Sequence, residues 1–260
     1  MILDEIVVKR KIQLEREKSE FSLDKVKSEA LKCSRAYAGF REALASPNKL
    51  SVISEVKKAS PSKGLIQPDF NPVQTAVTYE DNGADAVSCL TEEYYFQGCS
   101  RYFRDIRNNI KLPMIRKDFI FDPYQIYEAR IIGADAILLI AAILDDYQLK
   151  EYREIAKDMG MDILAEVHDE NELGRILELD FDIVGINNRN LKTFEVTLDT
   201  TARLAGMIPK DKVIVSESGI RDNSDMKAVR SYGADAVLIG ETLMRSGNIG
   251  RTLEELRNGV

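Results

Sequence analysis

The sequence repeats one short phrase at a fixed interval, and this interval limits the possible folds more than any other feature. The phrase occurs as NGADAVSCL at 82–90, IGADAILLI at 132–140 and YGADAVLIG at 232–240, and FDIVGIN at 181–187 fills the missing interval. Each glycine follows a helical pattern, as a C-terminal glycine does, and each aspartate precedes an apolar run. We interpret the phrase as a helix-to-strand turn, and its period of 50 residues as two strand–helix units.

Eight short apolar runs, rich in Val, Ile and Leu, follow this spacing, as parallel strands buried on both faces do. Helical patterns separate them, and the pattern at 122–133 begins with Asp122 as an N-cap and Pro123 in its first turn. Eight alternating units predict an α/β fold, a single (β/α)8 TIM barrel. A doubly wound sheet is the alternative, disfavoured because no GxGxxG motif follows the first run. The runs are 50–57, 85–90, 113–118, 135–140, 161–167, 182–187, 212–217 and 235–240.

The residues before the first strand are expected to be part of the same domain. Residues 1–48 are interpreted as two extra N-terminal helices packed on the barrel, so that 1–260 form one domain. The KRK at 9–11 is interpreted as a solvated helix face, and no fused second enzyme is expected. The two apolar stripes of these helices are Ile2, Leu3, Ile6 and Val7, and Val26, Ala30, Cys33 and Tyr37.

Composition excludes several classes of function. The net charge of −7 argues against nucleic acid as the main partner. No apolar run approaches the roughly 20 residues that a membrane helix needs, and the charged first residues lack a signal segment. Three scattered cysteines fit a reducing, cytoplasmic location. The single histidine, His168, leaves acid–base work to Lys, Glu and Asp, and no metal or other cofactor is expected.

Charged residues end several strands on the inward-facing side. Because side chains alternate along a strand, Glu55 shares a face with Ile53, Lys117 with Ile115, Glu166 with Leu164, and Glu217 with Val215. These strand ends are the active-site end of a barrel, so we predict a polar pocket there. A structural layer of ion pairs is the alternative. The segments VSESGI (215–220) and LIGE (238–241) match the usual phosphate-binding loops, which predicts a phosphorylated small-molecule substrate.

Seven segments, in this order, resemble indole-3-glycerol-phosphate synthase, a barrel enzyme of tryptophan biosynthesis. They are SEVKKASPSKG (54–64), LTEEYYFQG (90–98), IRKDFIFDPYQI (115–126), LAEVHDENE (164–172), GINNRNL (185–191), VSESGI (215–220) and LIGETLM (238–244). The first and third are specific to that family, and the resemblance spans nearly the whole chain. It implies that 1-(2-carboxyphenylamino)-1-deoxyribulose 5-phosphate is converted to indole-3-glycerol phosphate, with loss of carbon dioxide and water. We expect a monomer or a weak homodimer.

The resemblance also implies roles for individual residues. Lys117 matches the general acid that protonates the ketone oxygen. Glu166 matches its partner in acid–base transfer. Lys57 matches the lysine that contacts the substrate carboxylate and that is also proposed to act as an acid in dehydration. Burial and nearby cations are expected to lower the pKa of Lys117 toward working pH. Glu55 and Asn187 would assist dehydration. The residues implied in substrate binding are Arg189, Glu217, Ser60, Ser218, Gly219, Gly240, Glu241, Phe96, Phe119 and Leu138.

Two positions depart from a simple transfer of roles. Glu241 stands where some relatives have a small hydroxyl residue, so its backbone N–H is expected to bind phosphate while its side chain turns away. His168 follows Glu166 by two residues, but we assign it a capping or loop role. Three rival functions remain: a Schiff-base aldolase using Lys117 or Lys57, a non-catalytic phosphate-ligand sensor, and another aminoketose isomerase or synthase of the same pathway.

Overall fold

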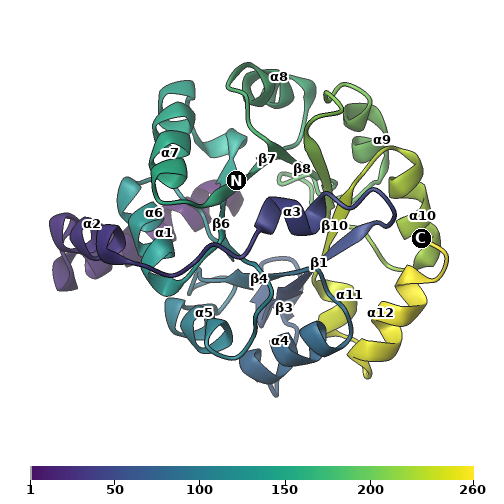
Figure 1. Cartoon of the computed structure of the whole chain (residues 1–260), viewed down its shortest axis with the longest axis horizontal. Coiled ribbons are helices and arrows are strands. Elements are labelled where there is room, and N and C mark those ends of the chain that lie inside the picture. Colours follow the sequence, from purple (N-terminus) through teal and green to yellow (C-terminus); the bar gives the residue numbers. More distant parts are fainter. Residues whose placement is uncertain (1) are drawn as a thin grey trace.

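The computed structural model describes residues 2–260 and contains a closed barrel of eight parallel strands (Figure 1). The strand order around the barrel is β1-β10-β9-β8-β7-β6-β5-β4, so each strand pairs with its neighbours in sequence and β1 closes the circle against β10. The predicted (β/α)8 barrel is therefore confirmed, and each predicted run matches a strand to within one residue at either end. The strands are β1 (Ser51–Val56), β4 (Ala86–Leu90), β5 (Met114–Lys117), β6 (Ala136–Ile140), β7 (Asp162–Val167), β8 (Ile183–Asn187), β9 (Val213–Glu217) and β10 (Ala236–Ile239).

Helices follow the strands and surround the barrel (Figure 1). Four begin at an aspartate whose side chain accepts a backbone N–H of the first turn: Asp122, Asp145, Asp169 and Asp222. Each of these helices lies within a predicted helical segment. The helices are α4 (Pro72–Asp81), α5 (Ser100–Arg107), α6 (Pro123–Ile132), the short 3-10 helix η1 (Ala141–Ile143), α7 (Asp146–Asp158), α8 (Glu170–Glu178), α9 (Asp199–Ala205), α10 (Asn223–Ser231), α11 (Glu241–Met244) and α12 (Ile249–Arg257).

The repeated aspartates join neighbouring strands at the N-terminal rim of the barrel. The Asp85 carboxylate accepts the backbone N–H of Val52 at 2.9 Å, and Asp135 and Asp235 accept those of Met114 and Ile214 in the same way. In each pair the aspartate's own backbone N–H donates back to the same residue at 2.9 Å. The repeat is thus a helix-to-strand turn, as predicted, and it also stabilises the rim opposite the strand ends that carry the charges.

The N-terminal segment forms three helices, whereas the sequence predicted two. They are α1 (Ile2–Glu20), α2 (Leu23–Lys32) and α3 (Phe40–Leu44). The second stripe is right at Val26 and Ala30, which are buried where α2 packs against α6, but wrong at Tyr37, which is 40 % exposed beyond the helix. The third helix inserts Phe40 and Leu44 into the apolar interior of the barrel. A five-residue helix is too short for a recognisable periodicity, which is why the sequence did not predict it.

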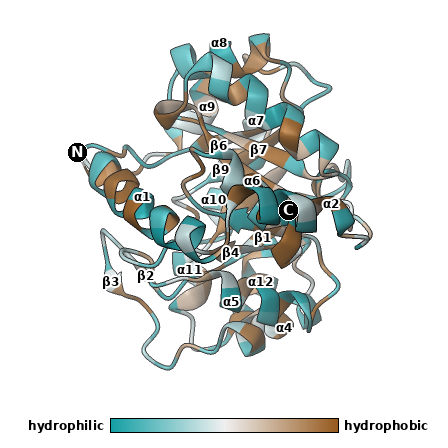
Figure 2. Ribbon diagram, turned by 90° about the vertical axis from the view of Figure 1, so that its left-hand side faces the viewer, coloured by the Kyte–Doolittle hydropathy of each residue, from teal (hydrophilic) through white to brown (hydrophobic). Residues whose placement is uncertain are grey.

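The α1 helix and a small hairpin lie at the end of the barrel where the strands have their C-termini (Figure 2). The hairpin, β2 (Ala59–Ser60) and β3 (Gly64–Leu65), belongs to the loop after β1 and was not predicted. Within residues 2–260, no helix has the length and apolar character needed to cross a membrane.

Candidate active site

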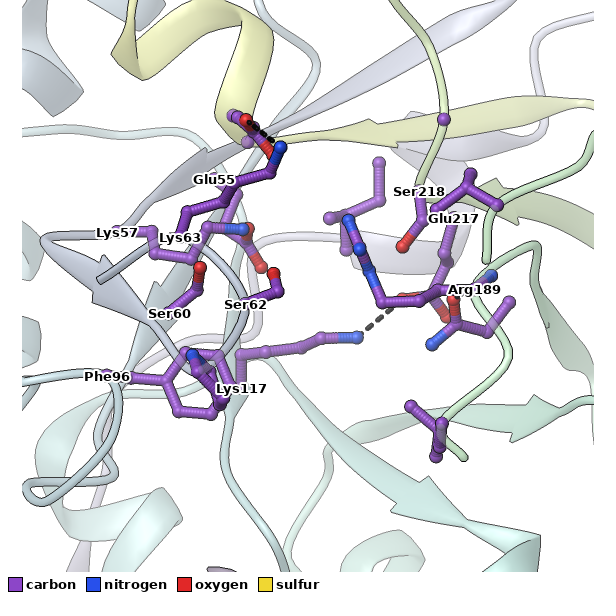
Figure 3. Close-up of a pocket in the computed structure, with 18 of the residues that line it drawn as sticks. Glu55, Lys57, Ser60, Ser62, Lys63, Phe96, Lys117, Arg189, Glu217 and Ser218 are labelled. Atoms are coloured by element: carbon purple, nitrogen blue, oxygen red, sulfur yellow. Dashed lines mark hydrogen bonds and ion pairs between the residues drawn. The ribbon is translucent and has the colours of Figure 1, made fainter. Parts of the chain in front are cut away.

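A cavity of about 760 Å³ opens at the C-terminal ends of the strands (Figure 3). It is lined by every residue that the sequence assigned to catalysis or substrate binding, although what each residue does there stays a prediction. Leu3 and Ile6 of α1 also line it. The predicted residues around it are Glu55, Lys57, Ser60, Phe96, Lys117, Phe119, Leu138, Glu166, Asn187, Arg189, Glu217, Ser218, Gly219, Gly240 and Glu241.

The alternation predicted along the strands explains how these side chains come together. Ile53, Ile115, Leu164 and Val215 lie in one apolar cluster that fills the barrel interior. Two residues further along each strand, the side chain again points inward, but it now meets the cavity instead of the core. Glu55, Lys117, Glu166 and Glu217 therefore form one polar layer above the apolar core.

Lys117 is the central cation of this layer. Its ammonium Nζ lies 3.1 Å from Glu166 Oε2 and 2.5 Å from Glu217 Oε2, and Figure 3 shows it reaching toward Glu217. Burial acts to lower the pKa of Lys117, but Glu217, Glu166 and Glu55 outweigh it and raise the pKa above its usual value. The prediction of a lowered pKa was wrong, because the charges nearest to the ammonium are carboxylates and not cations. Lys117 therefore stays protonated at neutral pH.

Glu217 has the opposite character to its neighbour Glu166. Burial and the nearby Glu166 carboxylate outweigh the attraction of Lys117 and raise the pKa of Glu217 to about 7. A carboxyl with this pKa exchanges a proton readily near neutral pH. Gly185 of β8 makes room for it, since a Cβ at that position would overlap the Glu217 carboxylate.

Glu166 is held in its ionised form from two sides. Burial acts to raise its pKa, but Lys117, His168 and Asn187 reverse this and lower the pKa well below its usual value. The imidazole Nε2 of His168 lies 3.4 Å from Glu166 Oε1. The sequence assigned His168 a capping or loop role: it lies in the turn between β7 and α8, where Asp169 and not His168 is the N-cap, and its imidazole contacts both Glu172 and Glu166.

Glu55 and Lys57 form an ion pair within the cavity wall, two residues apart on the first strand and the turn after it. Gly240 lies against this pair, and a Cβ at position 240 would collide with the Glu55 carboxylate and approach the Lys57 ammonium at 2.8 Å. A side chain at position 240 would therefore displace the pair from its present position.

The turns after β9 and β10 form the side of the cavity assigned to phosphate. Ser218 and Gly219 both have positive φ angles, 67° and 90°, which turn the chain sharply as β9 ends. The Glu241 side chain contacts two cations, Lys63 at 3.5 Å and Arg245 at 3.1 Å. These contacts offset its charge beside the turns that the sequence assigned to phosphate binding. Lys63 and Arg245 both line the cavity, and the sequence analysis did not single them out.

Phe96 and Phe119 form an aromatic wall. Their ring centroids are 6.0 Å apart with an interplanar angle of 41°. Glu92 holds the loop that carries Phe96, because its carboxylate accepts the backbone N–H groups of Tyr94, Tyr95 and Phe96. This wall and Leu138 are the apolar part of the cavity lining assigned to substrate binding by the sequence.

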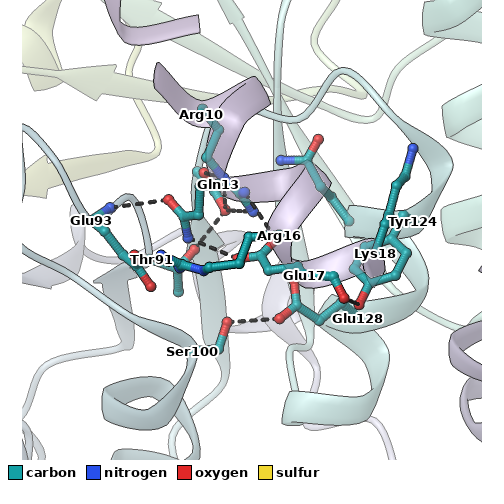
Figure 4. A network of polar contacts seen from close by, with 12 residues as sticks. Arg10, Gln13, Arg16, Glu17, Lys18, Thr91, Glu93, Ser100, Tyr124 and Glu128 are labelled. Carbon is teal, nitrogen blue, oxygen red and sulfur yellow. Dashed lines mark hydrogen bonds and ion pairs between the residues drawn. The ribbon is translucent and has the colours of Figure 1, made fainter. Parts of the chain in front are cut away.

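A buried charged network joins α1 to the end of β5 (Figure 4). Arg10 is fully buried and donates through Nε to Asp118 at 2.9 Å, and Arg116 donates to the same carboxylate at 2.9 Å. Thr91 and Glu128 complete the network. The prediction that 9–11 is a solvated face was wrong at Arg10, because the partner Asp118 lies 108 residues away and nothing local reveals it. Asp118 directly follows Lys117, so the network fixes the backbone from which Lys117 extends.

The comparisons with known proteins agree with this geometry. The family model described as indole-3-glycerol phosphate synthase matches residues 3–256. Curated proteins with that name from Alkaliphilus metalliredigens and Ruminiclostridium cellulolyticum are each 50% identical to the chain over 260 residues, covering 100% of this chain and 99% and 100% of theirs. Among solved structures, 3-hexulose-6-phosphate synthase from Salmonella typhimurium covers 80% of this chain and 97% of its own with a TM-score of 0.66, but at 12% identity it shows the fold alone. The chain belongs to the indole-3-glycerol phosphate synthase family.

Proposed function

We propose that this cavity carries out the reaction named by the family, the conversion of 1-(2-carboxyphenylamino)-1-deoxyribulose 5-phosphate to indole-3-glycerol phosphate, carbon dioxide and water. The observation that carries the proposal is the arrangement of Lys117 between Glu166 and Glu217, in a cavity that is also lined by the turns after β9 and β10. The reaction needs a proton donor at a carbonyl oxygen and a place for a phosphate.

Lys117 is the general acid of ring closure in this proposal. As the aromatic carbon attacks the substrate carbonyl, the oxygen takes a proton from the ammonium, which the surrounding carboxylates keep charged before substrate binds. Carbon dioxide then leaves from the same ring carbon and restores aromaticity. Glu166 exchanges protons with the substrate during condensation and dehydration, and Glu217 is suited to return a proton to Lys117 because its pKa is about 7.

Lys57 acts on the substrate carboxylate and later as an acid when water leaves. Its ion pair with Glu55 holds the ammonium at the cavity wall. Asn187, which donates to Glu166, assists the dehydration together with Glu55. Arg189 completes the charged wall.

The substrate phosphate occupies the loops after β9 and β10. The backbone N–H groups of Gly219 and Gly240 and the hydroxyls of Ser60 and Ser218 are the donors in this proposal. Glu241 contributes its backbone only, because its carboxylate is paired with Lys63 and Arg245.

The anthranilate ring of the substrate lies against the aromatic wall. Phe96 and Phe119 flank it and Leu138 forms the floor, which places the ring between apolar surfaces and the carbonyl near Lys117.

The rival functions are less well supported. A Schiff-base aldolase needs a neutral amine as nucleophile, and the raised pKa of Lys117 opposes this. A phosphate sensor leaves the layer of charged residues without a purpose. We further propose that residues 1–260 act as one domain, as a monomer or weak homodimer, and that the three unpaired cysteines reflect a cytoplasmic location.

The test is direct turnover. Purified protein is mixed with the substrate, and indole fluorescence is followed against a background of tyrosine, since the chain has no tryptophan. We expect a protein-dependent rise together with one carbon dioxide per indole. A folded protein that binds the substrate without any rise contradicts the proposal. In that case, borohydride trapping distinguishes the aldolase from the sensor.

A further inference from the structure

His168 lies between two carboxylates from two different elements. Its Nε2 is 3.4 Å from Glu166 Oε1 at the end of β7, and its Nδ1 is 3.0 Å from Glu172 Oε2 on α8. The backbone N–H of His168 also donates to Glu172 Oε2, at 2.8 Å. The Nε2 atom is buried and has no hydrogen-bond partner within residues 2–260, so its ion-pair contact with Glu166 is the interaction available to it.

The two oxygens of Glu166 are divided between two cations. Oε2 is 3.1 Å from the Lys117 ammonium, and Oε1 is the atom that faces His168. A carboxylate held at one oxygen alone can rotate about its terminal bond, whereas a carboxylate held at both oxygens cannot. Each oxygen of Glu166 thus has one cationic side chain beside it.

The imidazole is charged at neutral pH. Burial acts to lower the pKa of His168, but Glu166 and Glu172 outweigh it and raise the pKa to about 10. A protonated imidazole donates from both ring nitrogens and accepts nothing, so it is suited to hold two carboxylates and unsuited to act as a base. His168 does not line the catalytic cavity; it lines a neighbouring cavity that shares Asn187 and Arg189 with it.

We propose that His168 is a positioning residue for the reaction: anchored by Glu172, its imidazole holds Oε1 of Glu166 so that Oε2 faces Lys117. The four side chains Lys117, Glu166, His168 and Glu172 then form a chain of alternating charge from the cavity to the first turn of α8. The expected kinetic effect rests on the proposed function, whereas the contacts of His168 do not depend on it.

The kinetic test compares His168→Asn with Asp169→Asn. The second variant removes a charge one residue away and keeps a good N-cap for α8, so it serves as the matched control. We expect His168→Asn to lower kcat by about 10-fold or more, as the loss of an outer partner of a catalytic group does, with KM changed by less than about threefold. Asp169→Asn should keep wild-type values. Unchanged kcat in His168→Asn, or an equal loss in Asp169→Asn, overturns the proposal.

A second measurement does not depend on turnover. Since the chain has one histidine, its imidazole NMR signals need no assignment. We expect the imidazole to remain protonated above pH 8, and Glu166→Gln and Glu172→Gln each to lower its titration midpoint. An ordinary midpoint that neither variant moves overturns the contacts themselves. Absence of wild-type turnover together with the expected titration contradicts the proposed function and leaves the positioning contact in place.

Discussion

Replacing Lys117 by methionine removes the charge and keeps most of the volume of the side chain. The ammonium lies 3.1 Å from Glu166 Oε2, and at an effective dielectric constant of about 20 this attraction is roughly 5 kcal/mol before desolvation is subtracted. Because one pKa unit corresponds to about 1.4 kcal/mol, losing even half of that attraction raises the pKa of Glu166 by roughly two units. The variant therefore lacks the proton donor, and Glu166 is less strongly held in its ionised form.

We expect Lys117→Met to lower kcat by about 10³-fold or more, since general acid catalysis alone contributes roughly 10² to 10⁴. Substrate should still bind, because the turns after β9 and β10, which are proposed to hold the phosphate, do not involve position 117. The assay is single-turnover indole fluorescence, paired with calorimetric binding of indole-3-glycerol phosphate. Lys117→Arg is the matched variant that keeps a charge but not its geometry. A Lys117→Met protein with kcat within threefold of wild type refutes the assignment of the general acid.

Three further perturbations test other parts of the structure. Arg10→Met leaves buried Asp118 with fewer partners and should cost about 3 kcal/mol in the free energy of unfolding, measured by urea denaturation; an unchanged midpoint contradicts the role of the network. Gly240→Ala should raise KM about 10-fold or more, because its Cβ collides with Glu55, whereas Gly206→Ala, where a Cβ meets nothing within 4 Å, should not. The raised pKa of His168 predicts a stabilising contribution that is complete below pH 6.5 and lost as pH rises toward about 10. Urea midpoints that decline equally in wild type and His168→Asn over that range contradict it.

The sequence predicted the barrel well because its evidence is local. Each strand is a short apolar run, four of the flanking helices begin at a capping aspartate, and inward parity follows from a period of two. The same parity brought Glu55, Lys117, Glu166 and Glu217 to one layer without any knowledge of distance. These inferences depend on spacing along the chain, and the structure agrees with all of them.

What the sequence could not predict depends on partners far apart in the chain. Arg10 stands between two lysines on a charged helix, and only its contact with Asp118 distinguishes it from a solvated residue. The direction of the Lys117 pKa shift likewise depends on which charges surround the ammonium in space. The spacing of His168 from Glu166 was visible in the sequence, but only the structure shows its ring against the Glu166 carboxylate.

The aspartate contacts at the N-terminal rim have a consequence for how such barrels diverge. Asp85, Asp135 and Asp235 join neighbouring strands through backbone groups, and none of them lines the cavity. A change of loops at the opposite end therefore leaves these joints intact. The barrel of 3-hexulose-6-phosphate synthase shares this fold at 12% identity, so most side chains can be exchanged while the frame persists. Grafting the loops of one such barrel onto another should thus alter the chemistry at little cost in folding stability, provided that the recipient barrel keeps its own rim aspartates.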